Sequence, residues 1–247
     1  KKTDCLLMAN LAQFKRLCEK LKGQPFGLNK IGSLIKDAIE NYQKDNFVIK
    51  FNGHNLNLGQ RTHIMGILNL TPDSFSGDGL YRSSGINSIS ALDRIIEFAE
   101  KMVKDGADII DVGGESTRPG ARPISPKEEI NRVLTVVKRL SKRLKVPISI
   151  DTYKPEVAKA CFDAGAGILN NIMGTRLDIK LAKLAARYKS AVILMHIKGT
   201  PKTMQRNPEY KDLISEILVS LKKSIDFACS AGVDFSKIIV DPGIGFG

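Results

Sequence analysis

The sequence contains no tryptophan, and its 247 residues include only four cysteines and three histidines. The cysteines lie far apart and form no C-x-x-C pair; they are Cys5, Cys18, Cys161 and Cys229. This spacing predicts neither a structural zinc site nor a disulfide framework. Reduced thiols in a cytosol are the simpler interpretation, and we therefore expect a cytoplasmic protein.

Long apolar runs are also missing. No uninterrupted apolar stretch approaches the roughly 20 residues of a transmembrane helix, so we expect no membrane partner. Residues 1–20 lack the order of basic, apolar and small residues that marks a secretory signal. A hydrophobic content of 43% with 26% charged residues is ordinary for a soluble globular protein.

The net charge of +12 is not concentrated in one region. Residues 1–60 hold 10 basic and 5 acidic residues, giving +5, and residues 61–247 hold 28 and 21, giving +7. No nucleic-acid recognition motif and no set of stacking aromatic residues accompanies this charge. We expect no nucleic-acid partner, and a basic surface that favours small anionic molecules.

The first 45 residues predict a helical extension. Apolar residues recur at helical spacing over 7–22 and again over 28–43, with the turn "GQPFG" between the two segments. Residues 47–58 then alternate apolar and polar residues around Asn52-Gly53, the strongest short-range signal for a β-hairpin. We therefore expect a helical extension at 1–45 and a main domain at 46–247 that begins with a hairpin.

The main domain alternates short apolar runs with helical segments. The predicted strands are 64–68, 107–112, 147–150, 167–170, 191–195 and 237–240, and the predicted helices lie near 88–105, 126–143, 154–164, 177–188 and 209–231. This alternation is typical of an α/β protein with a parallel sheet. Strands so uniformly apolar predict a sheet that is covered on both faces.

Polar residues at the strand ends distinguish two α/β architectures. A dinucleotide-binding domain would place G-x-G-x-x-G after its first strand, and here "NLTPDSFSGDG" follows instead. A polar side chain stands at or near the end of all six strands: Asn69, Asp111, Asp151, Asn170, His196 and Asp241. Because a barrel builds its site at the C-terminal ends of its strands, the pattern favours a TIM (β/α)₈ barrel.

The residue types at this rim describe a ligand. Asp151, Asn170 and Asp241 offer acceptors and amide edges that suit a flat heterocycle with amino and ring N–H groups. Arg118, on the loop "GGESTRPGA", suits a phosphate or carboxylate, although a surface ion pair is the simpler alternative. His196 is interpreted as a packing residue, because the other two histidines suggest no metal cluster with it.

Six ordered motifs resemble dihydropteroate synthase over residues 47–247. They are "IMGILNLTPDSFSGDG", "GADIIDVGGESTRPGA", "SIDTYKPEVA", "ILNNI", "LMHIKGTPKTMQ" and "IIVDPGIGFG". The resemblance implies a TIM barrel that condenses 6-hydroxymethyl-7,8-dihydropterin diphosphate with p-aminobenzoate in folate biosynthesis. It also implies Mg²⁺ bound to the diphosphate.

The resemblance implies roles for individual residues. Asp151, Asn170 and Asp241 look like the residues that hold the pterin, with Met195 packing against it, and Asn69 looks like a ligand of Mg²⁺. The walls of the p-aminobenzoate pocket would be Phe75, Thr117, Pro119 and Phe246, with Arg118 on the same loop. Asp151, Arg118 and Asn69 are the candidate catalytic residues.

The sequence departs from the family pattern at its end. It stops at "GIGFG", after the sixth strand, whereas a closed barrel needs two further β/α units. We therefore expect a barrel truncated after the sixth strand, and a chain that is a fragment of a longer protein. Two alternatives stay open, a methyltetrahydrofolate:corrinoid methyltransferase and a noncatalytic pterin-binding subunit. A homodimer is left open as the assembly.

Overall fold

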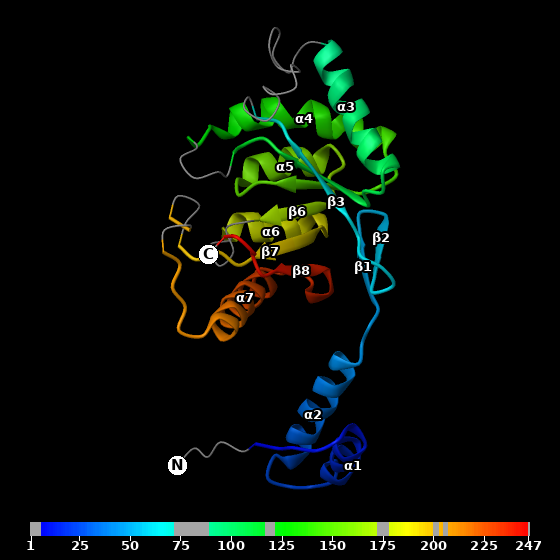
Figure 1. Ribbon diagram of the computed structural model, residues 1–247, viewed down its shortest axis with the longest axis vertical. Coiled ribbons are helices and arrows are strands. Elements are labelled where there is room, and N and C mark those ends of the chain that lie inside the picture. Colours follow the sequence, from blue (N-terminus) through cyan, green and yellow to red (C-terminus); the bar gives the residue numbers. More distant parts are fainter. Residues whose placement is uncertain are drawn as a thin grey trace. The chain divides into compact units, whose positions relative to one another are not determined.

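The computed structural model describes residues 6–71, 89–116, 122–171, 178–199, 203–204 and 207–246 (Figure 1). The chain divides into two compact units. The first runs up to Phe47 and includes Asn57–Arg61, and the second comprises Val48–Leu56 and Thr62–Gly247. The first unit contains the two N-terminal helices, and the second contains the main sheet and the candidate site.

The helices of the first unit are α1 (Leu11–Leu21) and α2 (Leu28–Tyr42). Helix α1 begins four residues later than the apolar pattern predicts, because Asn10 caps it: Asn10 and Gln13 each accept a 2.9 Å hydrogen bond from the other's backbone N–H. Gly32 lets the two helices approach closely, since a Cβ atom there would lie 2.9 Å from Cβ of Leu21. The predicted helical pair is confirmed.

The predicted hairpin is also present, as β1 (Phe47–Phe51) and β2 (His54–Leu58). Its turn residues Asn52 and Gly53 both have positive φ, 43° and 77°, as a type I′ turn requires. The Asn52 side chain donates to the carbonyl of Gly165 at 3.3 Å, just before the sheet strand β6 (Ile168–Asn171). The hairpin tip therefore packs at the N-terminal edge of the sheet, opposite the strand ends that carry the polar residues.

Among the described residues, the main sheet has six parallel strands in chain order. The other five are β3 (Met65–Asn69), β4 (Ile109–Gly113), β5 (Ile148–Asp151), β7 (Ala191–Met195) and β8 (Ile238–Asp241). Every neighbour in the sheet is the next strand in the sequence, and every pair is parallel. A doubly wound sheet reverses its strand order at a switch point, so the unbroken order is that of a (β/α) barrel.

In the part of the chain that the structure describes, five helices connect the strands, and Figure 1 shows them succeeding one another along the sheet. They are α3 (Ile89–Lys104), α4 (Pro126–Arg143), α5 (Pro155–Asp163), α6 (Ile179–Tyr188) and α7 (Leu213–Ser230). Helix α7 begins later than the predicted residue 209 because Asp212 caps it by accepting from the backbone N–H of Ser215. A single turn of 3₁₀ helix, Phe235–Lys237, leads into β8.

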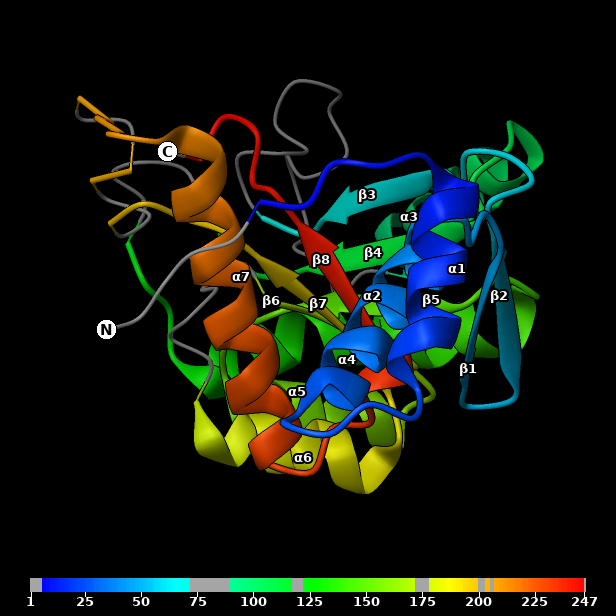
Figure 2. The ribbon, with the colours of Figure 1, turned by 90° about the horizontal axis from the view of Figure 1, so that it is seen from below.

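The two faces of the sheet carry different residues. Alternate strand residues pack against the helices in one buried core, among them Leu68, Ile110, Val112, Ile150, Leu169, Val192 and Leu194. In Figure 2 the helices α5, α6 and α7 lie on one side of the strands. Because side chains alternate along a strand, the residues between these apolar ones face the opposite side, which is the interior of the barrel. The candidate site lies on that interior face.

The prediction that the sheet is covered on both faces is wrong for its two edge strands. Ile67 on β3 is 61% exposed and Val240 on β8 is 47% exposed. Strand β7, in contrast, is buried at all five positions. The apolar composition of β3 and β8 matched that of the central strands, so only the strand order could reveal that these two form the edges of the six-stranded sheet.

Two sequence predictions concern the chain as a whole. Cys18, Cys161 and Cys229, the cysteines that the structure describes, are free thiols; Cys5 lies outside the described residues, and the absence of a disulfide framework stays a prediction. Among the residues that the structure describes, no helix has both the length and the apolar composition for a membrane span.

Candidate active site

Strand register brings three of the polar strand ends, together with one glycine, into one row. Asn69 is the partner of Gly113, Gly113 is the partner of Asp151, and Asp151 is the partner of Asn170. Partners in a parallel ladder project from the same face of the sheet, here the barrel interior. The structure thus assembles side chains that are about 100 residues apart in the sequence into one row across β3, β4, β5 and β6.

Gly113 provides the space between these side chains. A Cβ atom at Gly113 would lie 3.1 Å from Oδ1 of Asn69 and 3.7 Å from Oδ2 of Asp151. Both oxygens therefore border the same small volume above the Gly113 backbone. Any side chain at this position would occupy the space where a ligand can meet Asn69 and Asp151 together.

Asp111 lies two residues before Gly113 on the same face of β4 and is 4% exposed. The side-chain amide of Asn170 donates to Oδ2 of Asp111 at 3.0 Å. Burial raises the pKa of Asp111, although the hydrogen bond from Asn170 opposes this shift. Asp111 was counted among the polar strand ends but was assigned no role in the site; in the structure it lies on the same face as the row, two residues before Gly113.

Asp151 has the more strongly altered acidity. Burial raises the pKa of its carboxyl well above the ordinary value, and the negative charges of Asp111, Glu129 and Glu115 raise it further. A site with this excess of carboxylates stabilises a ligand that presents N–H donors or positive charge. The electrostatics thus agree with the heterocycle that the residue types predicted.

Met195 and Asp241 form a second pair, as register partners at the ends of β7 and β8. Met195 is buried, and Oδ1 of Asp241 accepts a 2.7 Å hydrogen bond from the backbone N–H of Gly243. Gly243 has a φ of +70° and lies so close to the His196 carbonyl that a Cβ atom would be 2.0 Å from that oxygen. The tight turn after β8 therefore requires glycine, and it fixes the carboxylate of Asp241.

His196 faces away from the row. It follows Met195 directly, so its side chain alternates to the opposite side, and its Nε2 lies 3.0 Å from the hydroxyl of Tyr210. Its backbone N–H donates to the carbonyl of Asp241. These contacts are those of a packing residue, but Nδ1 of His196 is buried without a hydrogen-bond partner among the described residues, so the interpretation of His196 stays a prediction.

The p-aminobenzoate residues of the sequence prediction are mostly not placed. Phe75, Thr117, Arg118 and Pro119 lie outside the described residues. Phe246 is described and is half-buried; its carbonyl accepts from the backbone N–H of Lys198 at 3.3 Å. The structure places Asn69, Asp151 and Asn170 in one row and pairs Met195 with Asp241, while the roles of these residues toward a pterin and of the others toward p-aminobenzoate stay predictions.

The row offers oxygen ligands for a cation without forming a metal cage. Among the described residues, no group of three or more His, Cys, Asp or Glu side chains is arranged to hold a metal ion. The amide oxygen of Asn69 points toward Gly113, since it would lie 3.1 Å from a Cβ atom at that position. One oxygen ligand from the protein, completed by phosphate oxygens and water, fits the usual coordination of Mg²⁺.

The fold and the site define a class, a parallel (β/α) barrel protein with a row of polar side chains at the C-terminal ends of its strands. The sequence profile of the pterin binding enzymes matches residues 65–247, and the chain belongs to this family. It is similar to dihydropteroate synthase from Clostridium beijerinckii, 45% identical over 199 residues, which are 81% of this chain and 68% of that protein. The resemblance seen in the motifs is confirmed.

Two further comparisons extend this result. A crystal structure of Yersinia pestis dihydropteroate synthase with a sulfonamide drug complex superposes with a TM-score of 0.72 at 39% identity, covering 81% of this chain and 69% of that one. A Halobacterium salinarum protein described as a probable bifunctional folylpolyglutamate synthase/dihydropteroate synthase is 41% identical over 244 residues, 99% of this chain and 28% of that protein. The N-terminal helices therefore also have a counterpart in a relative.

Proposed function

We propose that this chain supplies the pterin-binding part of a dihydropteroate synthase, which condenses 6-hydroxymethyl-7,8-dihydropterin diphosphate with p-aminobenzoate. The observation that carries the proposal is the interior row of Asn69, Gly113, Asp151 and Asn170, with Asp111 beneath it. The row stands in a chain of the pterin binding enzyme family, and its relatives include dihydropteroate synthases. The reaction would release pyrophosphate and form 7,8-dihydropteroate.

The pterin is held by its hydrogen-bonding edge. The carboxylates of Asp151 and Asp241 accept from its amino and ring N–H groups, and the Asn170 amide, oriented by its bond to Asp111, contributes both a donor and an acceptor. Met195, at the end of β7, packs against the ring. Burial deprives the Asp151 carboxylate of solvation, and the neighbouring carboxylates repel it. A hydrogen bond from a ligand N–H offsets both effects.

The bond that breaks joins the pterin methylene carbon to the diphosphate oxygen, and the bond that forms joins that carbon to the amine nitrogen of p-aminobenzoate. The amine loses one proton in this step. The carboxylates of Asp111 and Asp151 stabilise positive charge on the pterin methylene as the diphosphate leaves. Asn69 would hold Mg²⁺, which neutralises negative charge on the diphosphate.

The p-aminobenzoate would lie between residues of three segments, Phe75, Thr117 with Pro119, and Phe246, while Arg118 pairs with anionic groups of the substrates. The Phe75 aromatic ring supplies apolar contact, and exclusion of water protects the reactive methylene carbon. We further propose a cytoplasmic location and a homodimer. Size-exclusion chromatography with light scattering measures the molar mass and so tests the homodimer.

Calorimetry on the full-length protein tests the proposed function. Pterin diphosphate is titrated first and p-aminobenzoate second. One run contains MgCl₂, and a separate run contains pyrophosphate. A synthase binds p-aminobenzoate only after the pterin site is filled, and it releases pyrophosphate when both substrates are present. Pterin binding without p-aminobenzoate binding or pyrophosphate release would instead identify a noncatalytic pterin-binding protein.

A further inference from the structure

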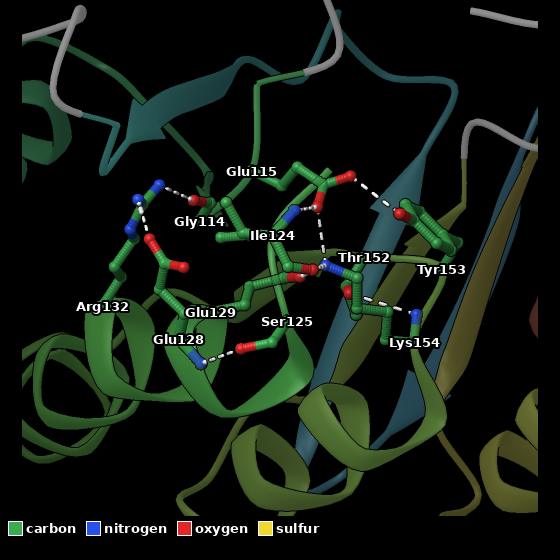
Figure 3. Close-up of polar contacts among 10 residues, drawn as sticks. All are labelled: Gly114, Glu115, Ile124, Ser125, Glu128, Glu129, Arg132, Thr152, Tyr153 and Lys154. Carbon is green, nitrogen blue, oxygen red and sulfur yellow. Dashed lines mark hydrogen bonds and ion pairs between the residues drawn. The ribbon is translucent and has the colours of Figure 1, made fainter. Parts of the chain in front are cut away.

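A buried cluster of charged residues lies directly beside the candidate site, and no step of the proposed reaction uses it. It is formed by Glu115, Glu129, Tyr153 and Lys154, here called the Lys154 cluster (Figure 3). Lys154 is 7% exposed and Glu129 is 1% exposed. Lysine and glutamate are seldom buried so completely unless they are paired.

The Lys154 ammonium has three partners on two segments. It donates to Oε2 of Glu115 at 2.6 Å, to Oε2 of Glu129 at 2.5 Å and to the carbonyl of Ile124 at 2.8 Å. These three bonds use every donor of the ammonium group. Lys154 also stands at the N-terminal end of α5, where the helix dipole disfavours a cation, so the two carboxylates are needed to hold it there.

Glu115 is the second centre of the cluster. Its carboxylate accepts from the Tyr153 hydroxyl at 2.8 Å and from the Ile124 backbone N–H at 2.9 Å, in addition to Lys154. Burial raises the pKa of Glu115, but these hydrogen bonds outweigh it and hold the pKa below the ordinary value. Glu115 is therefore a fixed anion.

The cluster fixes the chain where it leaves β4. Glu115 follows that strand by two residues and Ile124 precedes α4 by two, so Lys154 binds both described ends of the β4–α4 connection. Arg132 adds a 2.9 Å bond from Nη1 to the carbonyl of Gly114. Gly114 is pressed against α4, because a Cβ atom there would lie 2.7 Å from Cγ1 of Val133.

The same contacts fix the site. Gly113, which lies between Asn69 and Asp151 in the row, immediately precedes this anchored segment. Tyr153 and Lys154 follow Asp151 within three residues. Two carboxylates face one ammonium in the cluster, and the charges of Glu129 and Glu115 act on Asp151. Lys154 is thus linked to the row both through the backbone and through its charge partners.

We propose that Lys154 is a positioning residue of the synthase site: by joining Glu115, Ile124 and Glu129, it holds the exit of β4 in place beside Asp151. This inference rests on the proposed function. The residues expected to contact p-aminobenzoate follow Glu115 in the chain, whereas the pterin row lies on the strands. Loss of Lys154 should therefore affect p-aminobenzoate more than the pterin.

The test needs variants that separate positioning from folding. Lys154→Met alone leaves the buried carboxylate of Glu129 uncompensated, and such a variant can fail to fold. The double variant Lys154→Met/Glu129→Gln removes the charges of Lys154 and Glu129 and leaves Glu115 with its hydrogen bonds from Tyr153 and Ile124. Lys154→Arg keeps the positive charge. Lys159→Met is the matched control, because Lys159 lies on the same helix but is exposed, 2.7 Å from Asp163.

In the full-length protein, we expect the double variant to raise the KM for p-aminobenzoate about tenfold or more, while the Kd for pterin diphosphate changes less than about threefold. Lys154→Arg should recover part of this loss, and Lys159→Met should behave as wild type. A double variant with the thermal midpoint of the wild type and unchanged KM values for both substrates would overturn the proposal.

Hydrogen exchange provides a readout that does not depend on turnover. The Ile124 amide, which donates to Glu115, should exchange faster in the double variant than in the wild type, whereas amides of β6 should not change. Unchanged protection at Ile124 would overturn the positioning role even if the protein released no pyrophosphate. If the wild type releases no pyrophosphate, but the Ile124 amide still exchanges faster in the double variant, only the proposed function is overturned.

Discussion

The side-chain amide of Asn170 donates a 3.0 Å hydrogen bond to the carboxylate of Asp111, a residue 59 positions earlier in the chain. Asn170 lies on β6 and Asp111 on β4, so the bond spans the strand between them, which carries Asp151. The three side chains form one polar group on the barrel interior. This group is the structural basis of the proposed pterin recognition.

Replacing Asn170 tests this relationship. Asn170→Leu removes the donor and leaves the buried Asp111 carboxyl without it, so the free energy of unfolding should fall by about 1–3 kcal/mol. Urea unfolding measures this change, and pterin binding should be lost as well. Lys138→Ala, at an exposed position of α4, is the control and should leave the unfolding midpoint where it is. An equally stable Asn170→Leu would show that the bond contributes nothing.

Asp151→Asn should abolish pterin binding and raise the free energy of unfolding at neutral pH. The folded protein raises the pKa of Asp151 above the ordinary value of 3.8, so the folded state binds this proton more tightly than the unfolded state. Ionising the carboxyl therefore costs stability progressively as pH rises from about 4 through the raised pKa.

The Asp151→Asn variant lacks this cost, so at neutral pH it should have a higher free energy of unfolding than the wild type. Between pH 4 and pH 8 its stability should fall less than that of the wild type, as measured by thermal unfolding over this range. Pterin binding should be abolished. A variant that binds the pterin normally, or that loses stability at neutral pH, would contradict the assignment of Asp151.

Gly113→Ala should harm ligand binding without unfolding the protein. The added methyl group would lie 3.1 Å from Oδ1 of Asn69, in the volume proposed for the ligand. Affinity for pterin diphosphate should fall about tenfold or more, measured by calorimetry. Gly23→Ala is the control, since a Cβ atom at Gly23 meets nothing within 4 Å. Unchanged affinity in Gly113→Ala would show that the ligand does not bind next to Gly113.

Asn69→Ala tests the proposed Mg²⁺ ligand. Removing the amide oxygen should weaken the binding of pyrophosphate in the presence of Mg²⁺, and have little effect on its binding in EDTA. Calorimetry with and without the metal gives both values. Equal losses under the two conditions would mean that Asn69 contacts the phosphate or shapes the site without holding the metal.

Two further variants test the division between the substrates. Asp151→Ala should abolish pterin binding, whereas Phe75→Ala should mainly raise the KM for p-aminobenzoate, by about tenfold. Phe75 lies outside the described residues, so the kinetics provide the evidence for its role. Similar losses for both ligands in both variants would overturn the separation of a pterin side from a p-aminobenzoate side.

Much of the fold could be predicted from short segments of the sequence, because the spacing of apolar residues within a segment distinguishes a strand from a helix. The Asn52-Gly53 turn and the alternation of strands with helices are such local features, and both are confirmed. Helix starts were less certain, since apolar spacing continues past a cap: Asn10 and Asp212 set the starts of α1 and α7 by side-chain hydrogen bonds. Exposure of Ile67 and Val240 depended on strand order, which no single segment encodes.

The site was predictable where a polar residue ended a strand, because parallel strands bring their C-terminal ends to one edge. Asn69, Asp151 and Asn170 were found in this way, and their register places them together. Asp111 was harder to assign, because its role depends on the Asn170 bond across β5. Nothing in the sequence indicated that Lys154 is buried, since its partners Glu115 and Glu129 come from a different strand connection and a different helix.

Pyrophosphate release by the full-length protein tests the central claim most directly. The proposed function predicts release that requires both pterin diphosphate and p-aminobenzoate, with formation of dihydropteroate in equal amount, and that stops in Asp151→Asn even though this variant is stably folded. Release that is independent of p-aminobenzoate, or that persists in Asp151→Asn, would contradict the assignment of this interior row as the pterin site of a synthase.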